Sequence, residues 1–307
     1  MPAHLGDARL DGFAAESRAF YARRGTGRGP GSHEEVLALR ARARAAAPVS
    51  PPTTVEVVRA GGRTVPVRVH VPARGPVTGV HLHLHGGGFY LGTTAGDDAR
   101  HRALADASGL VVVGVDHRLA PEHPWPCGLE DCESAALWLA DHAGERFGTR
   151  RLTIGGSSAG ATLALGTLLR LRDRGLAPFG GAVLEFGTYD LSGCTPAGRR
   201  IAGEYFLQAY AGAVADRTDP DLSPVHADVS GLPPVLVVVG AEDVLLEDNL
   251  VMATRLAVAG VDVDVRVYPA SPHGFTGHAT SMAEAAREDV RSWLRQHPPS
   301  PPPPRGV

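Results

Sequence analysis

The stretch R-L-T-I-G-G-S-S-A-G, residues 151–160, places a short apolar run directly before the pattern G-x-S-x-G. A helix-length apolar segment, residues 159–171, follows it without a break. A serine at the centre of this pattern, between a strand and a helix, is typical of a nucleophile held on a sharp, strained turn. A glycine-rich turn without chemistry is the alternative. The stretch predicts an α/β fold with Ser158 exposed at a strand end, as the candidate nucleophile.

A serine hydroxyl needs a base that removes its proton and a carboxylate that orients the base. In folds with this motif the order along the chain is serine, acid, histidine. Asp243 comes just after the apolar run of residues 235–239, and His273 lies in the turn-rich loop P-A-S-P-H-G-F, residues 269–275. We therefore expect Ser158, Asp243 and His273 to form a catalytic triad.

Four neighbours of these residues are alternatives for the acid and the base. Glu242 directly precedes Asp243, while Glu247 and Asp248 suit the first turn of the next helix, where negative charge is favourable. His278 is close to the preferred histidine but lacks its turn-rich setting.

Three glycines end the run V-H-L-H-L-H-G-G-G-F, residues 80–89. The oxyanion of an acyl-transfer intermediate needs backbone N–H donors from the residue after the serine and from a loop after an early strand. Ala159 is expected to supply the first donor, and Gly87 and Gly88 the others, because glycine lets the backbone approach closely. His85 and Gly86 are expected to support this loop.

The same run raises the alternative of a metal site. His81, His83 and His85 occupy alternate positions, so their side chains share one face of a strand, and imidazole is a good zinc ligand. However, no aspartate follows at close spacing, and no second histidine–aspartate cluster is evident. The sequence therefore predicts hydrogen-bonded core histidines and no metal.

Strand-like and helix-like segments alternate through the middle of the chain. The first two strand segments show period two, as in a half-exposed hairpin, and most later ones are nearly all apolar, as in a buried parallel sheet. This alternation predicts a doubly wound α/β sheet with an antiparallel start. The strand segments are 55–58, 65–71, 79–84, 110–115, 151–154, 181–186, 235–239 and 263–268, and the helical ones include 129–139, 159–171, 247–258 and 282–294.

The two ends and one internal segment differ from this alternation. Residues 1–50 contain two polar, helix-length segments, and residues 191–228 are long and polar without a strand pattern. We expect both parts to form a helical cap over the ligand-binding edge of the sheet, with residues 51–297 as the catalytic domain. The proline-rich tail, residues 298–307, is expected to be disordered.

Composition excludes several function classes. The chain has 307 residues and a net charge of −3, so no basic excess is available to hold nucleic acid or an anionic membrane. The N-terminal residues show no signal-peptide pattern, and no apolar run is long enough to span a bilayer. Three cysteines do not suggest a disulfide framework, and a reducing, cytoplasmic location is expected.

Together these motifs resemble those of the hormone-sensitive-lipase-like esterases, also called bacterial family IV, of the α/β-hydrolase superfamily. The resemblance covers roughly residues 55–294. It is carried by H-G-G-G-F at 85–89, G-S-S-A-G at 156–160, D-V-L-L-E-D at 243–248, H-G-F at 273–275 and V-D-H-R-L-A-P-E-H-P-W-P at 115–126.

The resemblance implies an α/β-hydrolase fold with a helical cap and a carboxylesterase that acts on short to medium acyl esters. Ser158 would be the nucleophile, His273 the general base and then the acid, and Asp243 its orienting partner. The substrate would be a small ester and the intermediate an acyl-enzyme, with neither metal nor organic cofactor. Whether the chain forms a homodimer is left open.

Several positions depart from the family pattern. Ser157 stands where Asp or Thr is usual, Ala161 where Gly is usual, His117 where Tyr is common and Val244 where Pro is common. Ser157, His117 and Glu185 keep open a dedicated deacetylase, lactonase or acyltransferase with the same triad. A third hypothesis is a non-catalytic ligand-binding receptor on this fold, which predicts the loss of a triad member.

Two further positions are candidate substrate contacts. Glu185 is a carboxylate inside an otherwise apolar strand segment. Its alternative role is that of a paired, buried charge. Phe89 ends the glycine loop.

Overall fold

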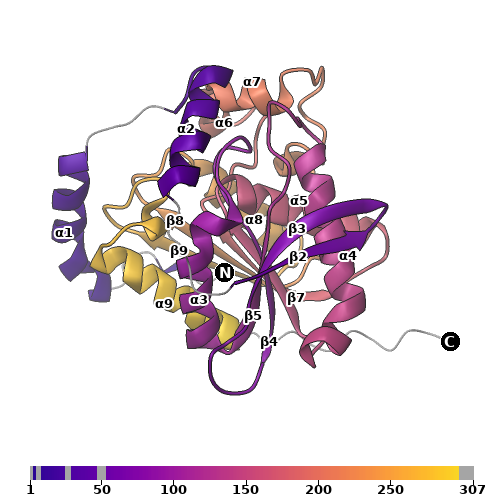
Figure 1. Cartoon of the computed structure of the whole chain (residues 1–307). Coiled ribbons are helices and arrows are strands. Elements are labelled where there is room, and N and C mark those ends of the chain that lie inside the picture. Colours follow the sequence, from indigo (N-terminus) through magenta and orange to yellow (C-terminus); the bar gives the residue numbers. More distant parts are fainter. Residues whose placement is uncertain (1–2, 5–7, 25–28, 47–52, 297–307) are drawn as a thin grey trace.

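A nine-stranded sheet runs through the computed structural model, with helices on both of its faces (Figure 1). The structure describes residues 3–4, 8–24, 29–46 and 53–296. The strands are β1 (Ala3–His4), β2 (Thr54–Ala60), β3 (Arg63–His70), β4 (Gly79–Leu84), β5 (Leu110–Val115), β6 (Leu152–Ser157), β7 (Phe179–Glu185), β8 (Val235–Gly240) and β9 (Val263–Tyr268). The helices are α1 (Ala8–Arg24), α2 (His33–Ala46), α3 (Asp98–Ser108), α4 (Cys127–Phe147), α5 (Ala159–Asp173), α6 (Pro196–Ile201), α7 (Tyr205–Ala211), α8 (Leu246–Val258) and α9 (Ser281–Gln296).

The strand order across the sheet is β1-β9-β8-β7-β6-β4-β5-β3-β2. β3 runs antiparallel to its neighbours β2 and β5, whereas every other neighbouring pair is parallel. The antiparallel start and the parallel centre that the sequence predicts are thus confirmed. In the centre of the sheet, β4, β5 and β8 are buried along their whole length, which explains their nearly continuous apolar sequences.

The strand order places a functional site at the adjacent strands β4 and β6. After β4 the chain crosses to β5 on one side, and β6 lies on the other side, so the connections from these neighbours diverge. In open α/β sheets this divergence leaves a crevice at the carboxyl ends of the strands, where ligands bind. The glycine loop follows β4 and Ser158 follows β6, so both lie at this crevice.

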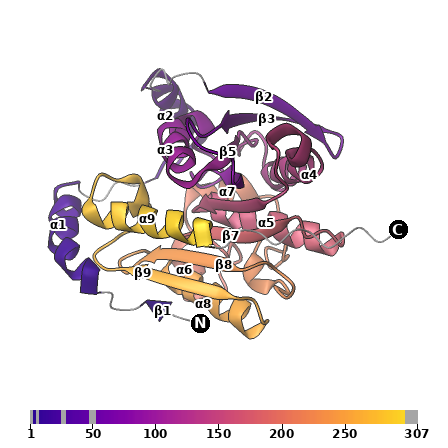
Figure 2. The same cartoon turned by 90° about the horizontal axis from the view of Figure 1, so that it is seen from below.

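Two apolar cores cover the two faces of the sheet. One combines alternate β4 residues with side chains from α4, α5 and α8, and the other combines residues of β7 and β8 with α1 and α9. α3 packs on β5 and also contacts α9, while α1 packs against one end of α9, as Figure 2 shows. The sheet is therefore a buried, rigid platform, and its strand ends hold the loops that carry the candidate site.

Helices α2, α6 and α7 gather at one end of the molecule, at the top of Figure 1. α6 and α7 belong to the segment between β7 and β8, in which the sequence predicts no strand, and the structure contains none there. α2 is held by Arg40, which donates to the backbone oxygens of Tyr90 (2.8 Å) and Ala120 (2.5 Å) and to Glu122 (2.7 Å). The helical cap stays a prediction as a domain, and α1 packs on α9 rather than beside α2.

Within the described part of the chain, no helix is long and apolar enough to cross a membrane. Cys127, Cys132 and Cys194 are free thiols, in agreement with the expectation that the chain has no disulfide framework. The proline-rich tail, residues 298–307, lies outside the described residues.

Candidate active site

Ser158 lies on a tight turn between β6 and α5, with φ of 54° and ψ of −122°. Its N–H donates to the backbone oxygen of Glu185 (2.8 Å), which ties the turn to the neighbouring strand β7. A Cβ on Gly156 would lie 2.5 Å from the backbone oxygen of Leu84, and a Cβ on Gly160 would overlap the same oxygen. Both glycines are needed because β4 passes so close to the turn.

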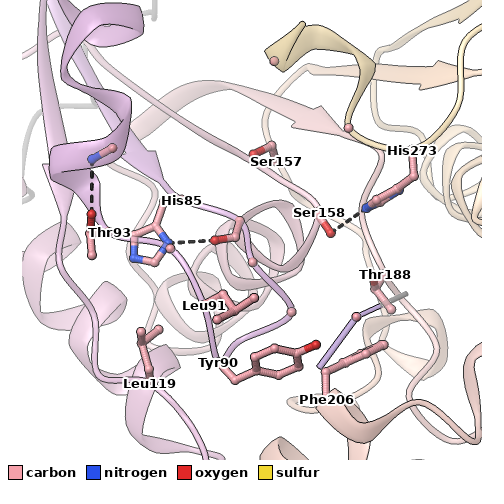
Figure 3. A pocket seen from close by; sticks show the side chains of 18 of the residues that line it. His85, Tyr90, Leu91, Thr93, Leu119, Ser157, Ser158, Thr188, Phe206 and His273 are labelled. Atoms are coloured by element: carbon pink, nitrogen blue, oxygen red, sulfur yellow. Dashed lines mark hydrogen bonds between the residues drawn. The ribbon is translucent and has the colours of Figure 1, made fainter. Parts of the chain in front are cut away.

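Ser158, His273 and Asp243 form a continuous hydrogen-bonded chain. The Oγ of Ser158 lies 2.9 Å from Nε2 of His273, as the dashed line in Figure 3 shows. Nδ1 of His273 lies 3.0 Å from both carboxylate oxygens of Asp243. This arrangement fits an imidazole that donates from Nδ1 to the carboxylate and accepts the serine proton at Nε2.

The surroundings of the acid and the histidine differ. The carboxylate of Asp243 is fully buried, whereas the side chain of His273 is 36% exposed. Asp243 also accepts a hydrogen bond from the N–H of Leu245 (2.8 Å), which fixes its orientation. The structure thus holds the acid rigidly in the protein and leaves the imidazole open to the site.

The alternative acids and base have other partners. Thr195 donates its hydroxyl to Asp248 (2.7 Å), and Glu247 pairs with Arg200 (3.3 Å). Nδ1 of His278 is hydrogen-bonded to the hydroxyl of Tyr21 (3.0 Å). Glu242 is exposed on the surface beside Asp243. None of the four takes part in the hydrogen-bonded chain of Ser158.

The glycine loop after β4 reaches the same place. Gly87 and Gly88 have φ of 121° and 58°, conformations that favour glycine. A Cβ on Gly86 would lie 2.6 Å from the backbone oxygen of Ser157, so the loop passes directly beside the serine turn. Ala159 is the first residue of α5, and the first N–H groups of a helix have no carbonyl acceptor within the helix. The structure therefore brings the three expected donors close to Ser158.

His85 supports this loop from the side. Its Nδ1 donates to the backbone oxygen of Gly86 (2.9 Å), and its ring stacks on that of His117, with centroids 4.2 Å apart. Burial lowers the pKa of His85, so its ring is neutral at neutral pH. His117, which departs from the family pattern, thus stacks on the histidine that supports the loop.

A cavity of about 1610 Å³ opens onto Ser158 and His273. Figure 3 shows Tyr90, Leu91 and Phe206 on its wall together with the serine and the histidine. Its lining comes from the glycine loop, from α2, from the segment around α6 and α7, and from the loops after β8 and β9. The mostly apolar wall beside a hydrogen-bonded serine and histidine suits a small organic substrate.

The two candidate substrate contacts lie behind this wall. Phe89 is buried and stacks on Tyr210, with ring centroids 3.9 Å apart. Glu185 is buried and forms a short hydrogen bond with Arg100, which itself lines the cavity. Arg100 is therefore the residue that meets the cavity, and the sequence reading missed it. A charged side chain in the first turn of α3 was its only signal.

The three alternating histidines have three different surroundings. Nδ1 of His81 is hydrogen-bonded to the hydroxyl of Thr153 (3.0 Å), and Nδ1 of His83 to Nε2 of His101 (2.9 Å). Burial lowers the pKa of His81 to about 3 and that of His83 well below its usual value. They are neutral core histidines, as expected. The expectation that no second histidine–aspartate cluster lies near them is wrong, because the fold brings Asp97 and His101 beside His83.

Comparisons with known proteins agree with this geometry. A family model described as alpha/beta hydrolase fold matches residues 81–277. The carboxylesterase NlhH of Mycobacterium tuberculosis is 34% identical over 82% of this chain and 86% of its own length. The carboxylic ester hydrolase LipN of the same organism is 31% identical over 86% of this chain and 77% of its own length.

Solved structures give the same picture. A bacterial heroin esterase superposes with a TM-score of 0.82 and 26% identity, over 95% of this chain and all of its own. An esterase from Pyrobaculum calidifontis superposes with a TM-score of 0.76 and 27% identity, over 94% of this chain and 92% of its own.

Proposed function

Since the chain belongs to the alpha/beta hydrolase family, we propose that it cleaves carboxylic esters with Ser158 as nucleophile, His273 as base and Asp243 as the orienting acid. The activity of the chain is carboxylester hydrolysis, and its resemblance to the hormone-sensitive-lipase-like esterases is confirmed. The assignment of the three residues rests on a single observation. Their side chains form an unbroken hydrogen-bonded chain at the wall of the cavity.

In the first half of the reaction, the Oγ of Ser158 attacks the ester carbonyl carbon while its proton passes to Nε2 of His273. The buried carboxylate of Asp243 stabilises the imidazolium that forms. The N–H groups of Gly87, Gly88 and Ala159 donate to the oxyanion, and the positive end of α5 favours the same charge. The C–O bond then breaks, the alcohol takes the proton from Nε2, and the acyl group stays on the serine.

In the second half, water enters the alcohol site and gives a proton to Nε2 of His273 as its oxygen attacks the acyl-enzyme. The same oxyanion donors hold the second tetrahedral intermediate. When it collapses, the acid leaves and the proton returns to the Oγ of Ser158. Each transferred proton passes through Nε2 of His273, and the cycle needs no organic cofactor.

The substrate that we propose is a short to medium acyl ester. Aromatic and aliphatic side chains, among them Tyr90, Leu91 and Phe206, line the cavity next to the serine. A dedicated deacetylase, lactonase or acyltransferase is the second candidate, because the charged side chain of Arg100 reaches the same cavity. We place the enzyme in the cytoplasm, without nucleic acid or a membrane as partner, and a homodimer is compatible with the same site.

The decisive variant is Ser158→Ala, with Ser157→Ala as its matched control one residue earlier. Ser158→Ala should lower kcat on p-nitrophenyl acetate and butyrate by at least about a thousandfold, because the nucleophile is gone. It should also abolish labelling by a fluorophosphonate, while Ser157→Ala keeps both properties. Labelling that persists in Ser158→Ala would place the nucleophile elsewhere, and an unlabelled wild type would favour a receptor.

A series of acyl lengths, run beside acetylated and lactone substrates, separates the two candidates. Fast hydrolysis of simple esters with a smooth dependence on acyl length supports the general esterase. A strong preference for one acetylated or cyclic substrate, or transfer to an added alcohol, supports the dedicated enzyme.

A further inference from the structure

A layer of buried polar side chains separates α3 from the sheet. His83 of β4 and His101 of α3 face each other there and are only 4% and 1% exposed. Their rings lie with centroids 4.6 Å apart, and Nδ1 of His83 is 2.9 Å from Nε2 of His101. Two imidazoles from separate elements therefore meet at one point inside the protein, close to the glycine loop.

Asp97 completes this group from the residue before α3. One donor atom each from His83, Asp97 and His101 lies within 4.8 Å of the other two. Among the described residues, this is the one group of three or more such side chains whose ligand atoms lie this close together. His83 belongs to β4, whereas Asp97 and His101 belong to the start of α3 and its preceding turn. The pattern of alternating histidines within the strand therefore could not reveal the group.

An aspartate just before a helix usually accepts a hydrogen bond from the first N–H groups of that helix, but Asp97 does not. Asp97 is the N-cap residue of α3, yet its side chain makes no capping hydrogen bond. Among the described residues, no side-chain hydrogen bond or salt bridge holds it, although the charge of Arg100 acts on it, and it lines the cavity. Its carboxylate therefore lies beside the two imidazoles without a hydrogen-bond partner of its own.

The imidazoles also have unused nitrogens. Among the described residues, neither Nε2 of His83 nor Nδ1 of His101 has a hydrogen-bond partner, although both atoms are buried. A buried polar atom without a partner costs free energy, and such atoms in a folded protein often mark an ion or water site. They are not the nitrogens that face each other, so each ring can carry its proton there when its facing nitrogen binds an ion.

We propose that His83, Asp97 and His101 bind a divalent transition-metal ion, with zinc as the best match. Two imidazole nitrogens and one carboxylate oxygen are a ligand set for zinc and its neighbours rather than for calcium or magnesium, which prefer oxygen alone. Because Asp97 borders the cavity, a water molecule can reach the fourth position of a tetrahedral site.

The local charge allows such an ion. Arg100 is a cation beside the group, because its charge acts on both imidazoles, and Glu185 pairs with its guanidinium. Asp97 acts on the same guanidinium, so two carboxylates offset one cation before an ion binds. Asp98 is likewise paired with Arg68 on the far side.

The ion would act on the structure of the glycine loop. It would join His83, at the end of β4, to Asp97, at the start of α3, and so close the loop of residues 84–96 that carries Gly87 and Gly88. Closing a loop stabilises a fold because the unfolded chain loses freedom. The proposed ion thus fixes the oxyanion donors without taking part in ester cleavage, and the proposal does not depend on the assignment of Ser158.

Metal binding to the full chain, expressed without a histidine tag and treated with a chelator, tests the proposal. Zinc content measured by mass spectrometry should reach one ion per chain, and cobalt should give the visible absorption bands of a four-coordinate site. Zinc should raise Tm. Asp97→Asn and His101→Gln should each weaken zinc binding by more than about 100-fold, since each removes a ligand.

His81→Gln is the matched control. His81 lies on the same face of the same strand, but its Nδ1 is hydrogen-bonded to Thr153 and it stands outside the group. This variant should bind zinc like the wild type. The proposal would be overturned if the wild type bound zinc no more tightly than Asp97→Asn. It would also be overturned if His81→Gln lost as much zinc affinity as the variants of the group. If His101→Gln does not fold, the comparison with Asp97→Asn decides alone. Fluorophosphonate labelling of wild type reports separately on the esterase site.

Discussion

At the residue scale, the position of Asp243 shows how burial and hydrogen bonding define a role. Its carboxylate is fully buried and holds Nδ1 of His273 with both oxygens, while the N–H of Leu245 fixes its rotation. Glu242, one residue away, is exposed and has none of these contacts. A carboxylate only one residue away, that of Glu242, therefore lies outside the hydrogen-bonded chain of Ser158.

Asp243→Asn should therefore lower kcat on p-nitrophenyl butyrate by about 10³ to 10⁴ and leave KM nearly unchanged. The amide of asparagine favours the wrong tautomer of His273, so Nε2 no longer accepts the serine proton. Glu242→Gln, the adjacent control, should retain wild-type kcat. Steady-state kinetics on both variants checks this, and equal losses in the two would remove Asp243 from its proposed role.

At the element scale, the junction of β6 with α5 has almost no free space. A Cβ on Gly160 would overlap the backbone oxygen of Leu84 and lie 2.7 Å from that of His85. These are backbone atoms of a central strand and its loop, so neither can move without disturbing the sheet. The start of the helix is therefore pressed directly onto the oxyanion loop.

Gly160→Ala should destabilise the protein by more than about 3 kcal/mol, because the new methyl group overpacks a rigid backbone contact. Gly203→Ala is the control, since a Cβ there has no neighbour within 4 Å. That variant should stay within about 0.5 kcal/mol of wild type. Urea unfolding followed by circular dichroism measures both, and similar stabilities of the two variants would contradict the packing argument.

The sequence predicts these elements well where the signal is local. The period-two hairpin of β2 and β3, the apolar strands and the turn at Ser158 each depend on neighbouring residues, as do the loops that carry Asp243 and His273. The paired, buried role of Glu185 was given as an alternative, but its partner Arg100 was missed because the two residues are 85 positions apart. Asp97 and His101 follow His83 closely in the sequence, but they were missed because only the packing of α3 on the sheet brings them to its side chain.

At the scale of the whole molecule, the buried histidines make stability depend on pH. Burial lowers the pKa of His117 to about 3, with a smaller contribution from the neighbouring His85. In the unfolded chain the same ring titrates near 6.5, so the unfolded state takes up the proton first. A depressed pKa of this kind contributes stability above pH 6.5, which is lost as the pH falls toward 3.

The free energy of unfolding should therefore fall from pH 7 to pH 4, and each such histidine contributes up to about 1.4 kcal/mol per pH unit. His117→Phe, which keeps a flat ring on His85, should give a shallower decline. His142→Gln, a change at an exposed histidine, should follow the wild type. Urea titrations at four pH values check this, and parallel curves for His117→Phe and wild type would contradict it.

The position of α2 has a consequence for how such a molecule can be redesigned. The reacting groups all come from residues 85–273, whereas α2 covers the cavity and is held by Arg40, by the buried side chain of Val36 and by His33, which lies 3.5 Å from Glu122. Because α2 carries no reacting group, it can be exchanged without rebuilding the groups beneath it. Grafting a different helix at 33–46 would change which molecules enter and how quickly products depart, while the bond-breaking step keeps its own rate.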